Sequence, residues 1–282
     1  MNSDEKIMSE EEFLKNYDYR KYPRPSVTVD IVVFGVLGED GGSYRKDEEK
    51  SISLLLVKRG GHPFMGKWAL PGGFLREDDE SVEKCAEREI FEETNVKPRS
   101  LMPIGTFSGK ERDPRGWIIS NAFVSVVEED CVNAHGGDDA EDARWFKGNL
   151  TKIEGESGRD LYKLEMRNGD TVLSAILEKT GCQFGRDIFK FVSGDDFAFD
   201  HALIIATAFS MLRKVAEDFD VLFDFLPEKF TLTSLQKVQE TILGVPLLAA
   251  NFRRKIEKLV VETDEYTSGA GHRPAKLFRK RV

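Results

Sequence analysis

The sequence predicts an α/β domain followed by a smaller domain of short helices and a β-hairpin. Runs rich in β-branched residues surround one amphipathic helix in the first part of the chain, which is typical of an α/β domain. After residue 200 the pattern changes to several helices and then two strand-like runs. With 282 residues, of which 40% are hydrophobic and 32% charged, the chain is long enough for roughly two domains.

The first part of the chain is predicted to begin with a lead-in and to continue as strands. Residues 1–25 are polar and contain a short predicted helix around Glu10–Tyr17. Asn168 and Gly169 form a strong hairpin signal, because this pair readily adopts the turn that joins antiparallel strands. The predicted strands are rich in alternating apolar or β-branched residues: Ser26–Val36, Ser51–Arg59, Gly116–Val127, Ala143–Lys147, Tyr162–Arg167 and Thr171–Lys179.

A single helix is predicted among these strands. Ser81 is a plausible N-cap, because its hydroxyl can accept a bond from the first turn, and the helix is expected to extend to Thr94. Four apolar residues lie at helical spacing and would be buried: Val82, Cys85, Ala86 and Ile90. We expect one face of this helix to pack on the sheet.

The last third of the chain has a different character. An amphipathic helix is predicted over Asp200–Asp218, and its apolar face must pack either on its own domain or on a partner subunit. A helix over Thr233–Leu243 ends at Gly244, and Asn251 is predicted to cap the next helix. Two strand-like runs follow. This order of helix, turn, helix and β-hairpin is the outline of a winged-helix DNA-binding domain.

Charge is unevenly distributed between the two parts. The formal net charge is −9, but residues 230–282 carry ten Lys and Arg against five acids, which leaves +5 there and −14 elsewhere. Arg253, Arg254 and Lys255 are predicted to face DNA from the second short helix, and His272 with Arg273 from the hairpin. The alternative for the three helix residues is an ordinary solvated basic surface.

Several classes of protein are disfavoured by the composition. The apolar stretches are too short to cross a bilayer, so we expect no membrane association. No secretory signal is visible, and Cys85, Cys131 and Cys182 are widely spaced, which argues against a disulfide framework or a cysteine zinc site. We therefore expect a cytoplasmic protein.

The strongest chemical signal is a cluster of carboxylates on the predicted helix. Glu89, Glu92 and Glu93 fall within an arc of ~100° at helical spacing. Like charges this close repel, and a hard cation such as Mg²⁺ or Mn²⁺ would relieve the repulsion. Upstream, Pro71, Gly72 and Gly73 allow a tight backbone bend. The alternative is a solvated acidic helix face.

The segment around this helix resembles the Nudix box. The matching residues are Gly73, Glu80, Arg88, Glu89, Ile90, Glu92, Glu93 and Val96. The match departs from the pattern at two places. Six residues, not five, separate Gly73 from Glu80, and Asn95 replaces the final glycine, which is a mild change because Asn tolerates the left-handed conformation. The longer loop would move Glu80 and weaken catalysis without affecting the three helix carboxylates.

The resemblance extends from about residue 17 to residue 281. Segments such as YPRPSVTVD, GKWALPGGF, RDPRGW and GHRPAKLFR are similar to ADP-ribose-type Nudix proteins that carry a C-terminal winged helix, a group that includes Nudix-related transcriptional regulators. The resemblance implies an α/β/α sandwich around a mixed sheet and a homodimer. It divides the chain into a lead-in (1–25), a Nudix domain (26–198), a linker helix with its connector (199–229) and a winged-helix domain (230–282).

The resemblance also implies roles for individual residues. Metal binding falls on Glu89, Glu92 and Glu93, and catalysis on Glu92, Glu93 and Arg88, with the choice of base left open. Gly73 would contact the substrate. Arg112 and Arg115 would clamp a diphosphate, since guanidinium groups bind phosphate in a bidentate way, or else belong to a surface turn.

Two functions follow from these features. The first is a DNA-binding regulator that senses ADP-ribose or a related nucleoside diphosphate, with Mg²⁺-dependent pyrophosphohydrolase activity left open. The alternative is a pure hydrolase with a structural C-terminal domain.

Overall fold

A large mixed sheet lies at the centre of the computed structural model, which describes residues 8–38, 50–95, 97–98, 100–128, 143–155, 158–267 and 274–281. Within these residues ten strands share the sheet, in the order β10-β9-β8-β7-β2-β1-β6-β5, with β3 on β2 and β4 on β1. Strands β1 and β6 are parallel, and β1 pairs antiparallel with β2 and β4. Their bounds are β1 Ser26–Gly38, β2 Lys50–Lys58, β3 Trp68–Ala69, β4 Gly72–Phe74, β5 Leu101–Phe107, β6 Ile118–Val126, β7 Ala143–Ile153, β8 Leu161–Asn168, β9 Thr171–Gln183 and β10 Arg186–Ser193.

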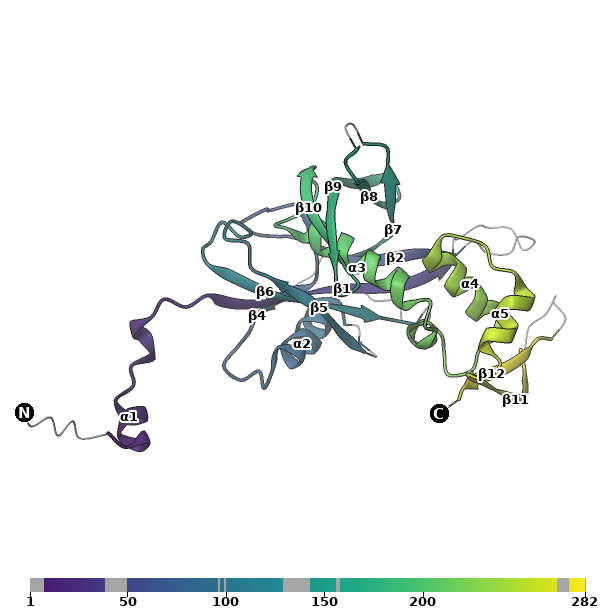
Figure 1. The fold of residues 1–282 in the computed structure, drawn as a ribbon, viewed down its shortest axis with the longest axis horizontal. Coiled ribbons are helices and arrows are strands. Elements are labelled where there is room, and N and C mark those ends of the chain that lie inside the picture. The colour runs from purple at the N-terminus through teal and green to yellow at the C-terminus, as the bar shows by residue number, and fades with distance from the viewer. Residues whose placement is uncertain are drawn as a thin grey trace, which may run out of the picture.

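Strand β1 is buried on both faces of the sheet. Its side chains alternate between the two faces, and one helix packs on each face. Val29, Ile31 and Val33 pack with helix α2 (Val82–Thr94) in one apolar cluster. Val32 and Phe34 belong to the cluster on the other face, which contains helix α3. Because successive residues of a strand point to opposite sides, one run of apolar residues supports both layers. The predicted α/β/α sandwich is confirmed (Figure 1).

Helix α3 (His201–Val215) is the second helical layer and packs on its own sheet. The ring of Phe209 lies 5.0 Å from that of Phe34, and most of the helix is buried. This settles the alternative left open by the sequence, which was packing on a partner subunit. The helix continues into a 3₁₀ turn over Asp220–Phe225 that leads to the C-terminal domain.

The C-terminal domain has the predicted helix–turn–helix and hairpin. Its elements are α4 Leu232–Leu243, α5 Ala249–Ile256, β11 Val260–Tyr266 and β12 Lys276–Lys280. Thr231 caps α4, and Gly244 ends it in the left-handed conformation. The predicted cap at Asn251 is wrong. Helix α5 begins at Ala249 after an extended Leu248 that makes no side-chain cap bond, so Asn251 lies inside the first turn.

The apolar core is continuous between the two domains. Leu235 and Ile242 of α4 and Phe252 of α5 belong to the same cluster as helix α3 and one face of the sheet. Strands β5 and β10, which were not predicted, form the two edges of the sheet. In the described ranges, none of the helices has the length and apolarity needed to cross a membrane.

The N-terminal arm, residues 8–25, lies apart from the sheet and its helices (Figure 1). Helix α1 (Glu10–Asn16) has a capping box at Ser9 but buries none of its residues. Phe13, Leu14 and Tyr22 are 52%, 63% and 63% exposed. The arm therefore presents large apolar side chains to its surroundings.

Candidate functional site

The carboxylates of helix α2 divide into two groups. Glu89 and Glu93 face the Gly72–Gly73 turn, whereas Glu92 is bound by arginines. Ser81 caps the helix as predicted, accepting from the Lys84 N–H at 3.3 Å. At its other end Asn95 adopts φ 54°, so asparagine takes the left-handed role of the family's glycine.

The Gly72–Gly73 turn fits closely against the two inward carboxylates. The N–H of Gly72 donates to Oε2 of Glu93 at 3.0 Å. A Cβ at Gly73 would come within 2.4 Å of Oε1 of Glu89. Gly73 thus leaves room for the Glu89 carboxylate, which a side chain at this residue would displace.

Burial, together with the nearby Glu89 and Asp30, raises the pKa of Glu93 to about 8 against the opposing effects of the Gly72 N–H and Arg59. A carboxylate that is desolvated beside like charges is stabilised by any cation placed between them. The pair Glu89 and Glu93 thus has the electrostatics of a cation site.

Arg88 ties the loop ahead of the helix to the helix itself. It donates to both oxygens of Asp79 at 2.9 and 2.7 Å and to Glu89 at 2.6 Å. Hydrogen bonds from Arg88 and from the Arg76 N–H hold the pKa of Asp79 well below its usual range. Asp79 therefore takes the place expected for Glu80, which is exposed. Asp79 follows Gly73 after five residues, so the extra residue lies between this acid and Arg88.

Glu92 points away from the turn. Arg76 binds it through two hydrogen bonds of 3.2 and 3.0 Å, and Arg88 approaches it at 3.3 Å. As a result, no three Asp, Glu, His or Cys side chains in the described part of the chain are arranged to hold a metal ion. The predicted trio is brought to one helix, but its three carboxylates do not converge.

A small hollow of about 80 Å³ lies beside the Gly72–Gly73 turn. Arg59 and Arg115 line it together with the ring of Phe199, which both guanidinium groups face at 4.8 and 5.4 Å. Burial and the charge of Arg115 lower the pKa of Arg59. Two cations held this close favour an anion between them.

Arg112 lines the same hollow, but it is buried and fully paired. Its guanidinium contacts Asp30 at 3.0 Å and Asp200 at 2.8 Å. Arg115 instead is 40% exposed at its side chain and pairs with Asp113. Of the two predicted clamp residues, only Arg115 is positioned to exchange its partner for a ligand.

The first turn of α3 completes the wall of this hollow. Nδ1 of His201 accepts the Leu70 N–H at 2.8 Å, and Nε2 lies 3.3 Å from Asp30. Burial raises the pKa of Asp30, but contacts to His201, Arg112 and Ser120 outweigh burial and hold it at about 2. The start of α3 is thus fixed to the strand that runs beside the Gly72–Gly73 turn.

The other end of α3 is fixed to the C-terminal domain. Nε2 of Gln239, on α4, donates to the carbonyl oxygen of Ala216 at 2.9 Å, and this hydrogen bond is buried. Phe219 packs against Phe252 of α5 with a ring separation of 6.2 Å. Helix α3 and the residues that follow it therefore contact both the wall of the hollow and the helix–turn–helix.

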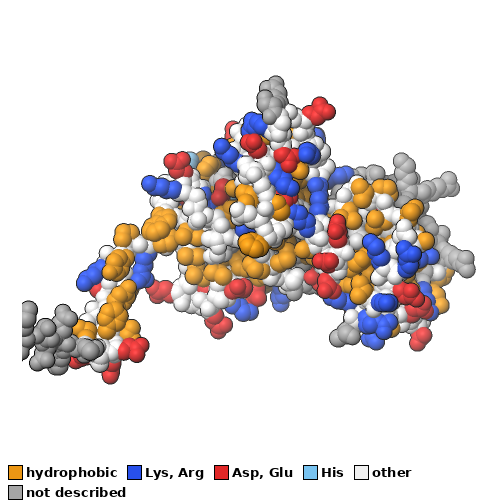
Figure 2. Space-filling model, in the orientation of Figure 1, with side chains coloured by type: hydrophobic (Ala, Val, Ile, Leu, Met, Phe, Trp, Pro, Cys, Tyr) orange, Lys and Arg blue, Asp and Glu red, His pale blue; other side chains and the backbone are white. Residues whose placement is uncertain are grey.

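The predicted DNA-facing residues of α5 are available to a partner. Arg253, Arg254 and Lys255 are all exposed. Figure 2 shows Lys and Arg side chains on the C-terminal domain with acidic side chains among them. His272 and Arg273 lie outside the described residues.

Asp79, Arg59 and Phe199 were not singled out from the sequence. The spacing of Asp79 from Gly73 was a usable signal, because it keeps the five intervening residues of the box. Arg59 ends an ordinary strand, and Phe199 precedes a helix cap; neither position has a pattern that marks a site.

Two family models match the chain. The model of the NUDIX domain matches residues 29–159, and that of the NrtR DNA-binding winged helix domain matches residues 222–279. The ADPR responsive transcriptional repressor NtrR of Acinetobacter baylyi is 29% identical over 273 residues, which cover 96% of this chain and 88% of that protein. An ADP-ribose pyrophosphatase of Methanocaldococcus jannaschii is 40% identical over 136 residues, covering 48% and 70%.

Solved structures resemble the whole chain as well. A MutT/nudix family protein from Enterococcus faecalis has a TM-score of 0.69 at 28% identity, and the match covers 97% of this chain and 94% of that one. Shewanella oneidensis NrtR complexed with a 27mer DNA has a TM-score of 0.60 at 26% identity, with coverage of 90% and 93%.

Proposed function

We propose that this chain is a DNA-binding transcriptional regulator that responds to ADP-ribose. The chain belongs to the Nudix family, and its Nudix domain is followed by an NrtR-type winged helix. The Nudix domain binds the ligand, and the winged helix binds operator DNA. Similarity to a repressor over 96% of the chain supports this function over that of a hydrolase with a structural C-terminal domain.

The connection made by helix α3 is the observation that carries this proposal. Asp200 and His201 contact the wall of the hollow, and the carbonyl oxygen of Ala216 binds Gln239 of the winged helix. A ligand that displaces the first turn of α3 would move the domain at its other end. A hydrolase needs no such connection.

The chemistry of the hollow fits the diphosphate of the ligand. Arg115 and Arg59 provide two guanidinium groups beside Gly73, and guanidinium groups bind phosphate oxygens in pairs. We assign Arg112 a positioning role: it holds Asp200, and through it the start of α3, in place. At about 80 Å³ the hollow must widen to admit a whole nucleoside diphosphate, so binding would displace its walls.

The carboxylates of α2 fit a divalent cation, Mg²⁺ or Mn²⁺. Glu89 and Glu93 present oxygen ligands at the Gly73 turn, and burial beside Glu89 and Asp30 raises the pKa of Glu93, which a bound cation would relieve. Glu92 would become a third ligand once it is released from Arg76. The Glu92–Arg76 ion pair is exposed, and pairs of this kind contribute only ~0–1 kcal/mol of stability. A bound cation supplies a Lewis acid for the phosphoryl group. Arg88 keeps Glu89 and the loop ahead of the helix in place. We also propose that the protein has pyrophosphohydrolase activity on ADP-ribose.

DNA binding is assigned to the C-terminal domain, residues 230–282. Arg253, Arg254 and Lys255 are the proposed groove and phosphate contacts, with His272 and Arg273 as contacts from the hairpin. A homodimer is proposed because paired half-sites require two winged helices and because the arm exposes Phe13, Leu14 and Tyr22. A cytoplasmic location follows from the proposed role on DNA.

A paired screen separates the two functions. Nucleoside diphosphate compounds are tested with Mg²⁺ for turnover and for a shift in Tm, and the protein is used to select duplexes from a random DNA pool. The regulator is expected to show a Tm increase with ADP-ribose and to enrich one DNA sequence. Turnover without any enriched sequence would leave the pure hydrolase.

A further inference from the structure

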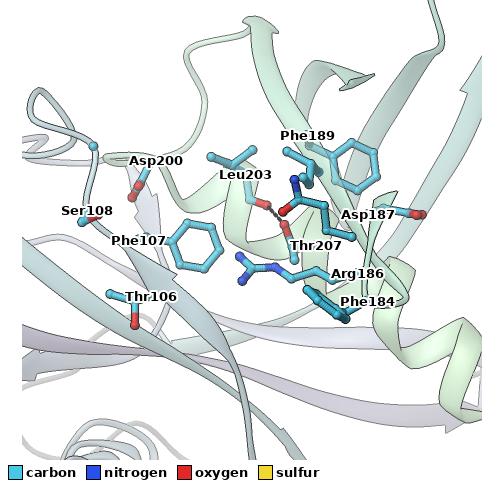
Figure 3. Close-up of a pocket in the computed structure, with 13 residues that line it drawn as sticks. Thr106, Phe107, Ser108, Phe184, Arg186, Asp187, Phe189, Asp200, Leu203 and Thr207 are labelled. Atoms are coloured by element: carbon cyan, nitrogen blue, oxygen red, sulfur yellow. Dashed lines mark hydrogen bonds between the residues drawn. The ribbon is translucent and has the colours of Figure 1, made fainter. Parts of the chain in front are cut away.

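A second and larger hollow lies on the α3 face of the sheet. Its volume is about 630 Å³, within the range of small-molecule sites, which is roughly 300–1,000 Å³. The two edge strands, β5 and β10, form its sides, and the first turns of α3 form its floor (Figure 3). The Arg112–Asp200 pair stands between this hollow and the one beside Gly73. We call it the edge pocket.

Arg186 gives the edge pocket a positive charge. Figure 3 shows its side chain reaching toward Phe107, whose ring lies 5.4 Å from the guanidinium carbon. With the residues that the structure describes, this guanidinium forms neither a hydrogen bond nor an ion pair. A half-buried arginine without an acidic partner favours an anionic ligand.

The acidic side chains of the wall do not neutralise Arg186. Asp187 binds Lys214 at 2.7 Å and Lys179 at 3.0 Å, and in Figure 3 its carboxylate points away from the pocket. Asp200 is held by Arg112. Because these charges are compensated elsewhere, Arg186 sets the sign of the field inside the pocket.

Strand β5 is shaped to receive this guanidinium. Gly105 has φ 143°, and the pairing of β5 with β6 shifts register there. A Cβ at Gly105 would come within 2.0 Å of Nη1 of Arg186. The glycine therefore leaves space for the arginine to lie across the edge of the sheet.

The remaining walls suit a flat ring and a polar linker. Phe107 and Phe189 are aromatic walls, and Phe184 stands fully exposed at the β9–β10 turn, where a stacked ring would cover it. Thr106 and Ser108 also line the pocket, although the Thr106 hydroxyl donates to Asn121. We propose that the edge pocket binds a nucleoside monophosphate, with the phosphate on Arg186 and the base against the aromatic residues. This site is separate from the proposed diphosphate site.

Calorimetry with adenosine monophosphate tests the proposal on the full-length protein, in EDTA so that no divalent cation is present. Adenosine and inorganic phosphate serve as probes that each lack one half of the ligand. Adenosine monophosphate is expected to bind at least about tenfold more tightly than either, because a charge-assisted hydrogen bond and ring stacking each contribute. Absence of measurable binding, or equal affinity for adenosine, would overturn the assignment.

Variants locate the binding. Arg186→Gln is expected to weaken binding about tenfold, and Arg186→Lys less, because it keeps the charge but not the planar fork. Gly105→Ala should weaken it too, since the guanidinium must move. Arg159→Gln removes an exposed arginine paired with Glu178 and should leave the affinity unchanged. Loss of binding in Arg115→Gln with retention in Arg186→Gln would place the nucleotide beside Gly73 and contradict the proposal.

Discussion

Helices α2 and α3 cover opposite faces of one sheet and use their polar groups differently. On α2 several charged groups form ion pairs that are at least partly exposed, such as Glu92 with Arg76 and Glu87 with Lys84. On α3 buried hydrogen bonds hold both ends, at His201 and just past the helix at Ala216, and a further one holds Ser210 on its side. Exposed ion pairs rearrange at small cost, whereas buried hydrogen bonds do not. This difference suits α2 to binding and chemistry and α3 to transmitting a displacement.

The largest effect is expected at α2. Glu92→Gln together with Glu93→Gln should lower Mg²⁺-dependent hydrolysis of ADP-ribose by about 10³-fold, within the range of ~10²–10⁴ for a lost general acid–base group. The fold should remain, because burial and then the charges of Glu89 and Asp30 disfavour the charged form of Glu93 in the native state. Steady-state kinetics and thermal unfolding measure the two effects. Glu87→Gln, which affects only the Lys84 pair, is the control, and full turnover in the double variant would show that the site is assigned wrongly.

A second prediction tests the far end of α3. Gln239→Leu leaves the carbonyl oxygen of Ala216 without its buried donor, which costs ~1–3 kcal/mol. Urea unfolding should show this loss, and the effect of ADP-ribose on DNA affinity should shrink. Gln236→Leu is the matched control, because Gln236 lies on the same helix but binds only Glu240 and Leu247. If ADP-ribose changed the DNA affinity of both variants by the same factor, the Gln239–Ala216 hydrogen bond would not contribute to the coupling.

A third test concerns the winged helix and changes no residue of α2 or α3. Arg253→Ala with Arg254→Ala should reduce the salt dependence of DNA binding by about two units of slope, because each lost phosphate contact removes about one. Binding is measured over a range of NaCl concentrations. Arg167→Ala, which removes an exposed charge on the sheet, should not change the slope. An unchanged slope in the double variant would mean that these arginines do not contact phosphates.

The smallest expected effect concerns the side of α3. Burial raises the pKa of Asp187, but its bonds to Lys214, Ser210 and Lys179 outweigh burial and hold the pKa well below its usual range. A carboxylate with a lowered native pKa adds stability above its unfolded value, about 3.9, and this stability is lost as the pH falls further. The free energy of unfolding should therefore fall more steeply between pH 6 and pH 3 for the wild type than for Asp187→Asn. Parallel curves would contradict the ion-pair assignment.

The sequence predicted the central elements because their patterns are strong. The alternation in β1, the cap at Ser81 and the Asn168–Gly169 turn all have local causes. Strand β5 was missed because Pro103 and Gly105 interrupt its pattern, and Gly105 lies at a register shift beside Arg186, which is distant in sequence.

Strand β10 was missed for a different reason. It buries Asp187 and exposes Ile188, which reverses the usual apolar pattern. The buried charge is stabilised by Lys214 and Ser210 of α3 and by Lys179 of β9, which lie beside it. Similarly, the choice of Asp79 over Glu80 depends on the path of the loop toward Arg88. Contacts between distant segments decide each of these cases, and local patterns do not contain them.

Calorimetric titration of ADP-ribose with and without operator DNA tests the central claim most directly. The protein carries Glu92→Gln so that the ligand is not consumed. If α3 couples the two domains, DNA changes the affinity for ADP-ribose by the same factor by which ADP-ribose changes the affinity for DNA, about 5–150-fold. Equal affinities for ADP-ribose in the two titrations would contradict the account and leave two uncoupled domains.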